Sequence, residues 1–178
     1  MKIAITLLSL VLLGSSCVAP QKPNMAADKL EPYQCGTVQR IHTLGGVFLA
    51  SQPATEDFKH AAEGGIKTVL NLRKDGELDW DEKVTVEKLG MSYHALPFKA
   101  PAELTDDVLD EARKFLNDTA NRPLLVHCAS ANRVGAVWLA HRVLDAGLSF
   151  EEAELEAKQV GLKLPAYTER VKQYIATR

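Results

Sequence analysis

A cysteine and an arginine with four residues between them are the pair in this sequence best suited to covalent chemistry. Cys128 follows a short apolar run at 124–126, and Arg133 precedes a stretch at 134–146 that is apolar on nearly all sides, as in a buried helix. Exposed N–H groups at a helix N-terminus, the helix dipole and a nearby guanidinium all favour a thiolate over a thiol. The sequence therefore predicts a nucleophilic thiolate at Cys128, where a strand gives way to a helix.

The residues between this pair are suited to binding an anion. They are small or polar, and none is bulky or β-branched: Ala129, Ser130, Ala131 and Asn132. Their backbone N–H groups can converge on one point, and Arg133 can add two parallel donors. The alternative is a buried structural cysteine beside a surface arginine, but strand, loop, arginine and helix agree on an anion-binding nucleophile.

The segments around this loop alternate between strand and helix patterns. Runs of apolar and β-branched residues predict strands at 38–43, 47–50, 68–72, 91–96 and 123–127. Helix patterns lie between and after these runs. Strands separated by helices predict an α/β fold with helices on both faces of the sheet. Ligands of such sheets bind beyond the carboxyl ends of the strands, which is where Cys128 lies.

Two other strand ends carry polar residues. Arg73 and Glu77 follow the strand at 68–72, at the same sheet edge as Cys128 if the strands run parallel. They either order a substrate at the rim of the site or form a solvated turn. Gln52 follows the strand at 47–50 in the same way, and we interpret it mainly as part of a helix entry.

The composition is that of one ordinary globular domain. The chain has 178 residues, of which 46% are apolar and 25% charged, and its formal net charge is −2. It has no basic stripe, so nucleic acid is not an expected partner. His42, His60 and His141 lack partners at ligand spacing, so we expect no metal and no cofactor. The composition leaves the oligomeric state open.

The first residues form a pattern typical of export. Residues 1–16 contain one lysine, an apolar run and small residues, which predicts a signal peptide. The residues before Cys17 resemble the bacterial lipoprotein cleavage box, so we expect lipidation of Cys17; the alternative is ordinary cleavage near Ala19. Residues 17–36 are polar and rich in proline, as in a tether, and 37–178 form the domain. We therefore expect a periplasmic or envelope protein that contacts the membrane only through this lipid.

Export also places the chain in an oxidising compartment, where a further cysteine needs an explanation. Cys35 is either a spectator in the N-terminal segment or a resolving partner for Cys128, and the spacing favours neither decisively.

Together these motifs resemble a known family. HCASANR at 127–133 is similar to the signature of cysteine-dependent protein tyrosine and dual-specificity phosphatases. More closely, GGVFLASQPATEDFKHAAEGGIKTVLNLRKDGE, LGMSYHALPF and LLVHCASANRVGAVW resemble the bacterial beta-lactamase-hydrolase-like, or phosphatase-like, domains of that superfamily, over most of residues 38–162. The resemblance implies a three-layer sandwich, with a mostly parallel central sheet of four to five strands and helices on both faces.

The resemblance also implies roles for the loop residues. Cys128 would attack phosphorus and become a phosphocysteine, while Arg133 and the loop N–H groups hold the equatorial oxygens. His127 would favour the thiolate by ordering the loop. The implied activity is that of a phosphoric monoester hydrolase acting on a small-molecule or protein substrate.

Three features depart from the usual phosphatase pattern. The loop has four residues between cysteine and arginine instead of five, and Val134 stands where a serine or threonine is usual. The segment at 94–100, where the general acid is expected, contains no carboxylate. Asp106 is our candidate for that acid, although Asp106 and Asp107 also fit the first turn of a helix.

These departures keep two other functions open. Rhodanese-type sulfurtransferases share the four-residue spacing, so the chain is alternatively a persulfide carrier with a sulfur-bearing substrate. A module that binds an anion or a partner protein without catalysis is the other alternative.

Overall fold

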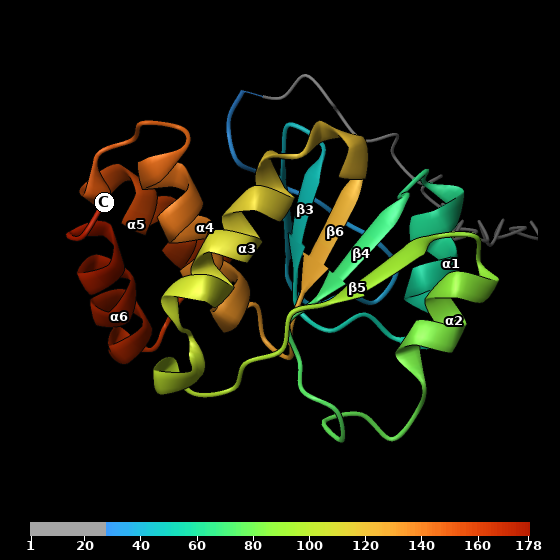
Figure 1. The fold of residues 1–178 in the computed structure, drawn as a ribbon. Helices are drawn as coiled ribbons and strands as arrows, with labels where there is room; N and C mark the ends of the chain where they lie inside the picture. The colour runs from blue at the N-terminus through green and yellow to red at the C-terminus, as the bar shows by residue number, and fades with distance from the viewer. Residues whose placement is uncertain (1–27) are drawn as a thin grey trace, which may run out of the picture.

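The protein is built around one mixed sheet of six strands, which lies between two groups of helices in Figure 1. A computed structural model describes residues 28–178 of the chain. The strand order is β1-β2-β3-β6-β4-β5, in which β3, β6, β4 and β5 run parallel and β2 pairs antiparallel with both β1 and β3. The strands are β1 (Glu31–Pro32), β2 (Ile41–Leu44), β3 (Val47–Ala50), β4 (Thr68–Asn71), β5 (Ser92–Ala95) and β6 (Leu124–His127). The expected α/β fold is confirmed.

The sheet has one strand more than the four to five that we expected. The additional strand, β1, pairs Glu31 with Thr43 and Pro32 with His42 at the edge of the sheet. It lies inside the segment expected to be a tether, and Tyr33 beyond it packs edge-on against Phe48 with ring centroids 4.9 Å apart. The residues that cover the sheet edge therefore begin before residue 37.

Strand β6 lies between β3 and β4, and its register fixes where the polar residues meet. His127 is opposite Ala50 of β3 and opposite Asn71 of β4. All four residues of β6 are buried, as is usual for a strand covered on both faces. Because the three strands are parallel, the segments that leave their carboxyl ends emerge side by side. This register brings the connections after residues 50, 71 and 127 to one edge of the sheet.

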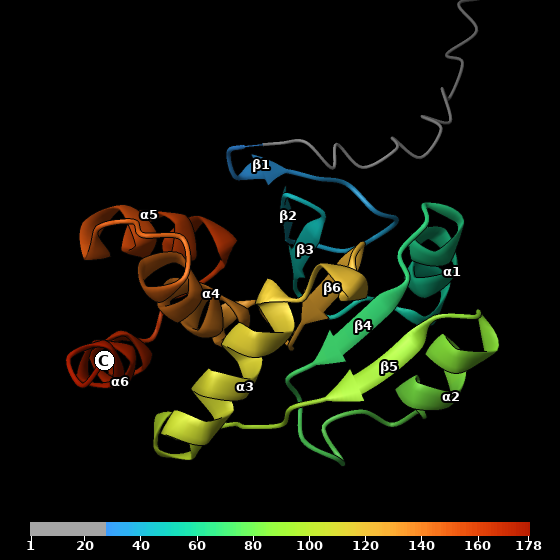
Figure 2. The same cartoon turned by 45° about the horizontal axis from the view of Figure 1, so that its top comes forward.

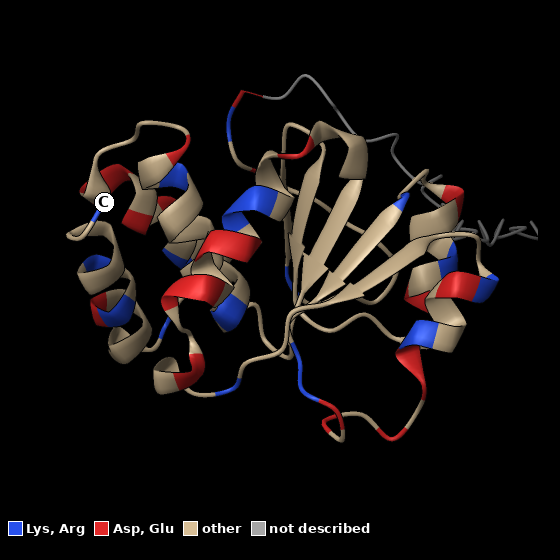
Figure 3. Cartoon of the chain, viewed as in Figure 1, with Lys and Arg blue, Asp and Glu red and all other residues tan. Residues whose placement is uncertain are grey.

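Helices cover both faces of the sheet, as Figures 1 and 2 show. One face carries α1 (Thr55–Glu63) and α2 (Glu82–Lys88). The other carries α3 (Asp106–Asn117), α4 (Asn132–Leu144), α5 (Phe150–Val160) and α6 (Pro165–Ile175), with short 3-10 turns η1 (Pro101–Glu103) and η2 (Thr119–Asn121). Two buried apolar clusters fill the spaces between sheet and helices. Charged residues lie on the helices and on the connection between β4 and α2 (Figure 3).

Helix α4 is the central helix of its layer. Its residues from Arg133 to His141 are all buried, which agrees with a sequence that is apolar on nearly all sides. Gly135 lets α5 approach it closely. A Cβ atom at Gly135 would lie 2.7 Å from the backbone nitrogen of Leu162 and 2.8 Å from the carbonyl oxygen of Ala157. Both neighbours are backbone atoms, so they cannot turn aside.

Gly135→Ala is accordingly expected to destabilise the fold by about 1–3 kcal/mol, because α5 must shift away from α4. Urea denaturation measures this change. Gly64→Ala is the control, since Gly64 has a helical φ of −72° and its nearest atom to an added Cβ would be 3.2 Å away. Equal stability of the two variants would contradict the close approach.

Candidate active site

Cys128 begins the loop that follows β6, and its backbone is tied to both neighbouring strands. Its N–H donates to the carbonyl of Ala50 (3.4 Å), while the carbonyl of His127 accepts from the N–H of Leu72 (3.0 Å). The carbonyl of Ala129 accepts from the N–H of Gln52 (3.3 Å). Cys128 as a whole residue is 1% exposed. The candidate nucleophile therefore has a fixed place at the sheet edge.

The loop turns directly into α4 and leaves its N–H groups available. Ala131, with a φ of 65°, is the N-cap residue of α4, while Ala129 and Ser130 are exposed. Within residues 28–178 the N–H groups of 129–133 donate to no protein acceptor, as is usual for the start of a helix. The side chain of Asn132 faces elsewhere, since its Oδ1 accepts from the N–H of Lys163 (2.7 Å). These residues thus leave backbone donors that an anion could use.

Arg133 is held in place by groups from two strand ends. One terminal nitrogen donates to the carbonyls of Leu72 (3.0 Å) and Phe98 (2.8 Å) and to Oε1 of Glu77 (2.8 Å). The other donates to Oε2 of Glu77 (2.8 Å). This use leaves Nε–H and one N–H of the second terminal nitrogen, a parallel pair suited to an oxyanion. Arg133 is therefore oriented before any anion binds.

Glu77 is the carboxylate that orients Arg133. The hydrogen bonds from Arg133 lower the pKa of Glu77 from 4.5 to about 2, against the opposing effect of burial. A carboxyl group with a lowered pKa stabilises the folded state fully above its unfolded pKa. That contribution is lost as the pH falls from 4.5 to 2.

We therefore expect Glu77→Gln to lose less free energy of unfolding than the wild type between pH 4.5 and pH 2, because the variant lacks the titrating carboxyl group. Urea denaturation at several pH values in this window tests the difference. Glu56→Gln, at an exposed pair with Lys59 on α1, serves as the control and should follow the wild type. Identical pH dependence of Glu77→Gln and the wild type would show that the pair with Arg133 does not form.

Arg73 stands at the wall of the site. One terminal nitrogen donates to Oε1 of Gln52 (2.6 Å), and the other donates to the backbone carbonyl of Glu77. Its Nε lies 3.4 Å from Oε2 of Glu77, and its side chain is 11% exposed. These contacts favour an ordering role for Arg73 over a solvated turn.

His127 has a buried carboxylate beside it that sequence reasoning missed. Nε2 of His127 lies 2.9 Å from Oε1 of Glu82 in the first turn of α2, and the two side chains are 0% and 3% exposed. Oε2 of Glu82 accepts from the amide of Gln52 (2.6 Å). Nothing in the sequence around Glu82 indicates that α2 lies close to the end of β6, so Glu82 could not be identified as a site residue from the sequence. Gln52 could be, because it follows a strand that ends at the same sheet edge.

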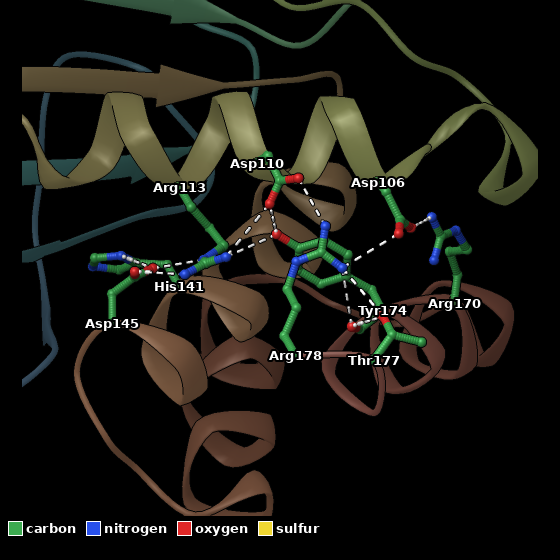
Figure 4. A network of polar contacts seen from close by, with 9 residues as sticks. All are labelled: Asp106, Asp110, Arg113, His141, Asp145, Arg170, Tyr174, Thr177 and Arg178. Atoms are coloured by element: carbon green, nitrogen blue, oxygen red, sulfur yellow. Dashed lines mark hydrogen bonds and ion pairs between the residues drawn. The ribbon is translucent and has the colours of Figure 1, made fainter.

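Asp106, our candidate for the general acid, faces α6. It pairs with Arg170, and its other oxygen lies 3.3 Å from Arg178 (Figure 4). Hydrogen bonding to Arg170 lowers the pKa of Asp106, which makes it a poor proton donor at neutral pH. In the same network Arg113 binds both oxygens of Asp145 at 2.8 and 2.7 Å. The network fastens α6 to α3 and α4, and we assign Asp106 to it.

Glu103, another carboxylate near this position, is also held by a hydrogen bond and an ion pair. Its Oε2 accepts from the N–H of Lys99 (2.7 Å), and its Oε1 lies 3.0 Å from Nζ of Lys74. Val134 is fully buried in the core and brings no hydroxyl to the loop. Neither residue fills the catalytic positions that the usual phosphatase pattern occupies.

The two described cysteines, Cys35 and Cys128, are both free. Cys35 packs in the cluster against α1 and α2, whereas Cys128 belongs to the cluster on the opposite face of the sheet. Burial raises the pKa of Cys35 to about 11, so its thiol is a poor partner for disulfide exchange. These facts favour a spectator role for Cys35. The predicted signal peptide and Cys17 lie outside the described residues.

A cleft of about 610 Å³ opens beside the site, between the connection after β4 and the ends of β4 and β5. Its lining includes Arg73, Glu82, Trp80, Asn71 and Tyr93. Within residues 28–178 no group of three His, Cys, Asp or Glu side chains is placed to hold a metal. None of the helices in that part of the chain is long and apolar enough to cross a membrane.

Comparison with solved structures shows the same fold in proteins that are described as phosphatases or phosphatase-like. The core catalytic domain of the PP-IP phosphatase SIW14 from S. cerevisiae, in complex with citrate, superposes with a TM-score of 0.67 at 18% identity, covering 79% of this chain and 88% of that one. TpbA of P. aeruginosa, in complex with pTyr, gives 0.63 at 17% identity, covering 82% and 88%. A putative phosphatase of Neisseria meningitidis gives 0.60 at 23% identity, covering 72% and 92%.

Comparison of sequences identifies the family. The chain is 28% identical over 125 residues to the beta-lactamase hydrolase-like protein of Agrobacterium fabrum, covering 67% of this chain and 28% of that protein. A protein of the same description from Xylella fastidiosa is 26% identical over 111 residues, covering 60% and 25%. The chain thus spans about a quarter of the length of these relatives. The profile described as "Beta-lactamase hydrolase-like protein, phosphatase-like domain" matches residues 42–144. The match covers more than half of the chain, which therefore belongs to the family of phosphatase-like domains of beta-lactamase hydrolase-like proteins.

Proposed function

We propose that this protein is an exported cysteine-dependent phosphatase that hydrolyses phosphate monoesters. The observation that carries the proposal is the loop after β6. It brings together Cys128, backbone N–H groups without a protein acceptor in residues 28–178, and the Nε side of the Arg133 guanidinium. Family membership supports it, and so do the structural neighbours, one of which is named as a complex with pTyr and another as a PP-IP phosphatase.

In the proposed reaction the thiolate of Cys128 attacks phosphorus while the bond between phosphorus and the ester oxygen breaks. The alcohol or phenol leaves and takes a proton from water, and a phosphocysteine remains. Water then attacks this intermediate, the P–S bond breaks, and phosphate and the thiolate are released. The loop N–H groups and the Nε edge of Arg133 hold the three equatorial oxygens as their charge develops.

The test is hydrolysis of p-nitrophenyl phosphate by the purified protein, with inhibition by vanadate. Turnover that vanadate inhibits is the expected result. A protein that neither hydrolyses aryl phosphates nor binds vanadate or phosphate does not have this function.

Glu103 and Asp106 are both held in hydrogen bonds and ion pairs, and this leads to a prediction about substrates. Because neither carboxylate is free to protonate the leaving oxygen, we expect turnover to depend steeply on leaving-group acidity. A general acid is worth about 10²–10⁴-fold, so phenyl phosphate should be hydrolysed slower than p-nitrophenyl phosphate by a factor of that order. Rates for a series of substituted phenyl phosphates measure the dependence. Equal rates across the series would reveal an acid that we have not identified.

The route to the envelope is also part of the proposal. Residues 1–16 act as a signal peptide, and lipidation of Cys17 anchors the domain through the segment that follows. Fractionation of cells that produce Cys17→Ala tests this step. Release of the variant into the soluble periplasmic fraction supports the anchor, whereas unchanged membrane association contradicts it.

A sulfurtransferase is the second candidate function, favoured by the four-residue loop and by the absence of a hydroxyl at Val134. Incubation with thiosulfate followed by mass spectrometry decides between the two. A gain of one sulfur at Cys128 supports a persulfide carrier, and no adduct argues against it. Tight phosphate binding without any turnover would instead identify a binding module without catalysis.

A further inference from the structure

A continuous series of polar contacts joins the residue before Cys128 to the arginine that closes its loop. On one side His127 lies 2.9 Å from Glu82, and on the other Glu77 binds Arg133 at two points, at 2.8 Å each. Between these pairs the contacts pass through Gln52 and Arg73. In order, the series is His127, Glu82, Gln52, Arg73, Glu77 and Arg133.

Gln52 is the residue that connects the two halves of this series. Its Nε2 donates to Oε2 of Glu82 (2.6 Å), and its Oε1 accepts from a terminal nitrogen of Arg73 (2.6 Å). A side-chain amide is both donor and acceptor, so it can satisfy a carboxylate and a guanidinium at once. A methionine of similar length can do neither, and a glutamate would face Glu82 with a second negative charge. The chemistry of this position therefore favours glutamine.

The burial of Glu82 makes its contacts important. Its side chain is 3% exposed, and within residues 28–178 no lysine or arginine nitrogen lies within 4.0 Å of its carboxylate. A buried carboxylate without a cation depends on the hydrogen bonds and the imidazole that surround it. Gln52, His127 and the hydroxyl of Tyr93 provide these contacts, so the position of the His127 ring is linked to the amide of Gln52 through Glu82. His127 is covalently joined to Cys128, and Gln52 also donates its backbone N–H to Ala129.

We propose that Gln52 and Glu82 are positioning residues, which hold His127 and Arg133 in a fixed relation so that the loop between them encloses an oxyanion. They touch neither substrate nor phosphorus, and act through the residues at the two ends of the loop. The kinetic part of this proposal rests on the proposed phosphatase function. The structural part does not, because it concerns the order of the loop itself.

The experiment compares Gln52→Met, Glu82→Gln and their double variant with the wild type, by kcat for p-nitrophenyl phosphate, vanadate inhibition and thermal unfolding. Gln159→Met, at an exposed position on α5, is the matched control. We expect Gln52→Met to lower kcat and vanadate affinity by about 10–100-fold, by analogy with the loss seen when groups that orient metal ligands are removed. The double variant should be no worse than the more severe single variant, because both changes break the same series of contacts.

Gln52→Glu separates positioning from packing. It keeps the length of the side chain and the acceptor for Arg73, but sets a carboxylate against Glu82 at the site of a 2.6 Å hydrogen bond. The charged and titratable groups that face this position are Glu82 from α2 and Arg73 after β4, with His127 of β6 and Tyr93 of β5 beyond Glu82. We expect the pH optimum of kcat to move toward acid, because a shared proton would restore the contact. A variant that merely packed less well would lose activity without moving its optimum.

A readout that needs no turnover completes the test. Iodoacetate is an anion that alkylates thiolates, and peptide mapping by mass spectrometry gives its rate at Cys128 apart from the other cysteines. We expect Cys128 in Gln52→Met to be alkylated at least about tenfold more slowly than Cys128 in the wild type and in the Gln159→Met control. The proposal would be overturned if Gln52→Met kept the wild-type kcat, vanadate affinity and alkylation rate. Additive effects in the double variant would overturn it as well.

If the wild type itself hydrolyses no phosphate ester, the proposed function fails, while alkylation still decides the positioning role. If Gln52→Met does not fold, Gln52→Glu and Glu82→Gln decide it by the same measurements.

Discussion

Cys128→Ser is expected to lower kcat for p-nitrophenyl phosphate by about 10⁴-fold or more, because a serine hydroxyl at this position has no base to activate it. Binding of inorganic phosphate should persist in the variant. The loop N–H groups and Arg133 remain in place, and the substitution removes the negative charge of a thiolate that would oppose the anion. Steady-state kinetics and calorimetric titration with phosphate measure the two effects separately.

Cys35→Ser is the matched control for this substitution. Cys35 packs on the other face of the sheet, so its variant should keep the wild-type kcat. A protein that remains active with serine at 128 would refute covalent catalysis by this thiol. Loss of phosphate binding together with activity would instead show that the cysteine is needed to build the loop.

Arg133→Lys is expected to lower kcat by about 10²–10³-fold, the effect of removing a donor aimed at a developing oxyanion. Lysine keeps the positive charge beside Glu77, but it has no planar fork. It cannot bind Glu77 at two points and at the same time present a parallel pair of N–H groups to the substrate. The loss should therefore appear in kcat and in vanadate affinity more than in thermal stability.

The control for this variant is Arg170→Lys, at a pair with Asp106 that joins α6 to the start of α3. A pair of this kind contributes little to stability and, in our account, nothing to turnover. If Arg133→Lys keeps kcat within about threefold of the wild type, the guanidinium does not bind the transition state. The anion would then be held by the loop N–H groups alone.

The parts of the site that could be predicted from the sequence are local ones. Cys128, Arg133 and the small residues between them form a contiguous loop, and the apolar run at 134–146 marks the helix behind them. Helix caps such as Asp81 and Thr105 are equally local, and each accepts a hydrogen bond from a backbone N–H of the first turn of its helix. Such features are determined by a few neighbouring residues, so their patterns can be read directly.

The parts that could not be predicted depend on contacts between distant segments. Glu82 reaches His127 only because α2 packs against β5 and places its first turn near the end of β6, and neither residue shows this locally. Asp106 was a candidate because the segment at 94–100 has no carboxylate, and its partners Arg170 and Arg178 come from α6 and beyond. Strand β1 has two residues, too few to carry a periodic pattern. Tertiary packing decided each of these positions.

The central claim is that the thiolate of Cys128 attacks phosphorus, and trapping the intermediate tests it most directly. The wild-type protein is mixed with a ³²P-labelled aryl phosphate, quenched in acid within one turnover and digested for peptide mapping. Our account predicts label on the peptide that contains Cys128, with none in Cys128→Ser and the full amount in Cys35→Ser. Hydrolysis of the substrate with no label on Cys128 at any quench time would contradict it.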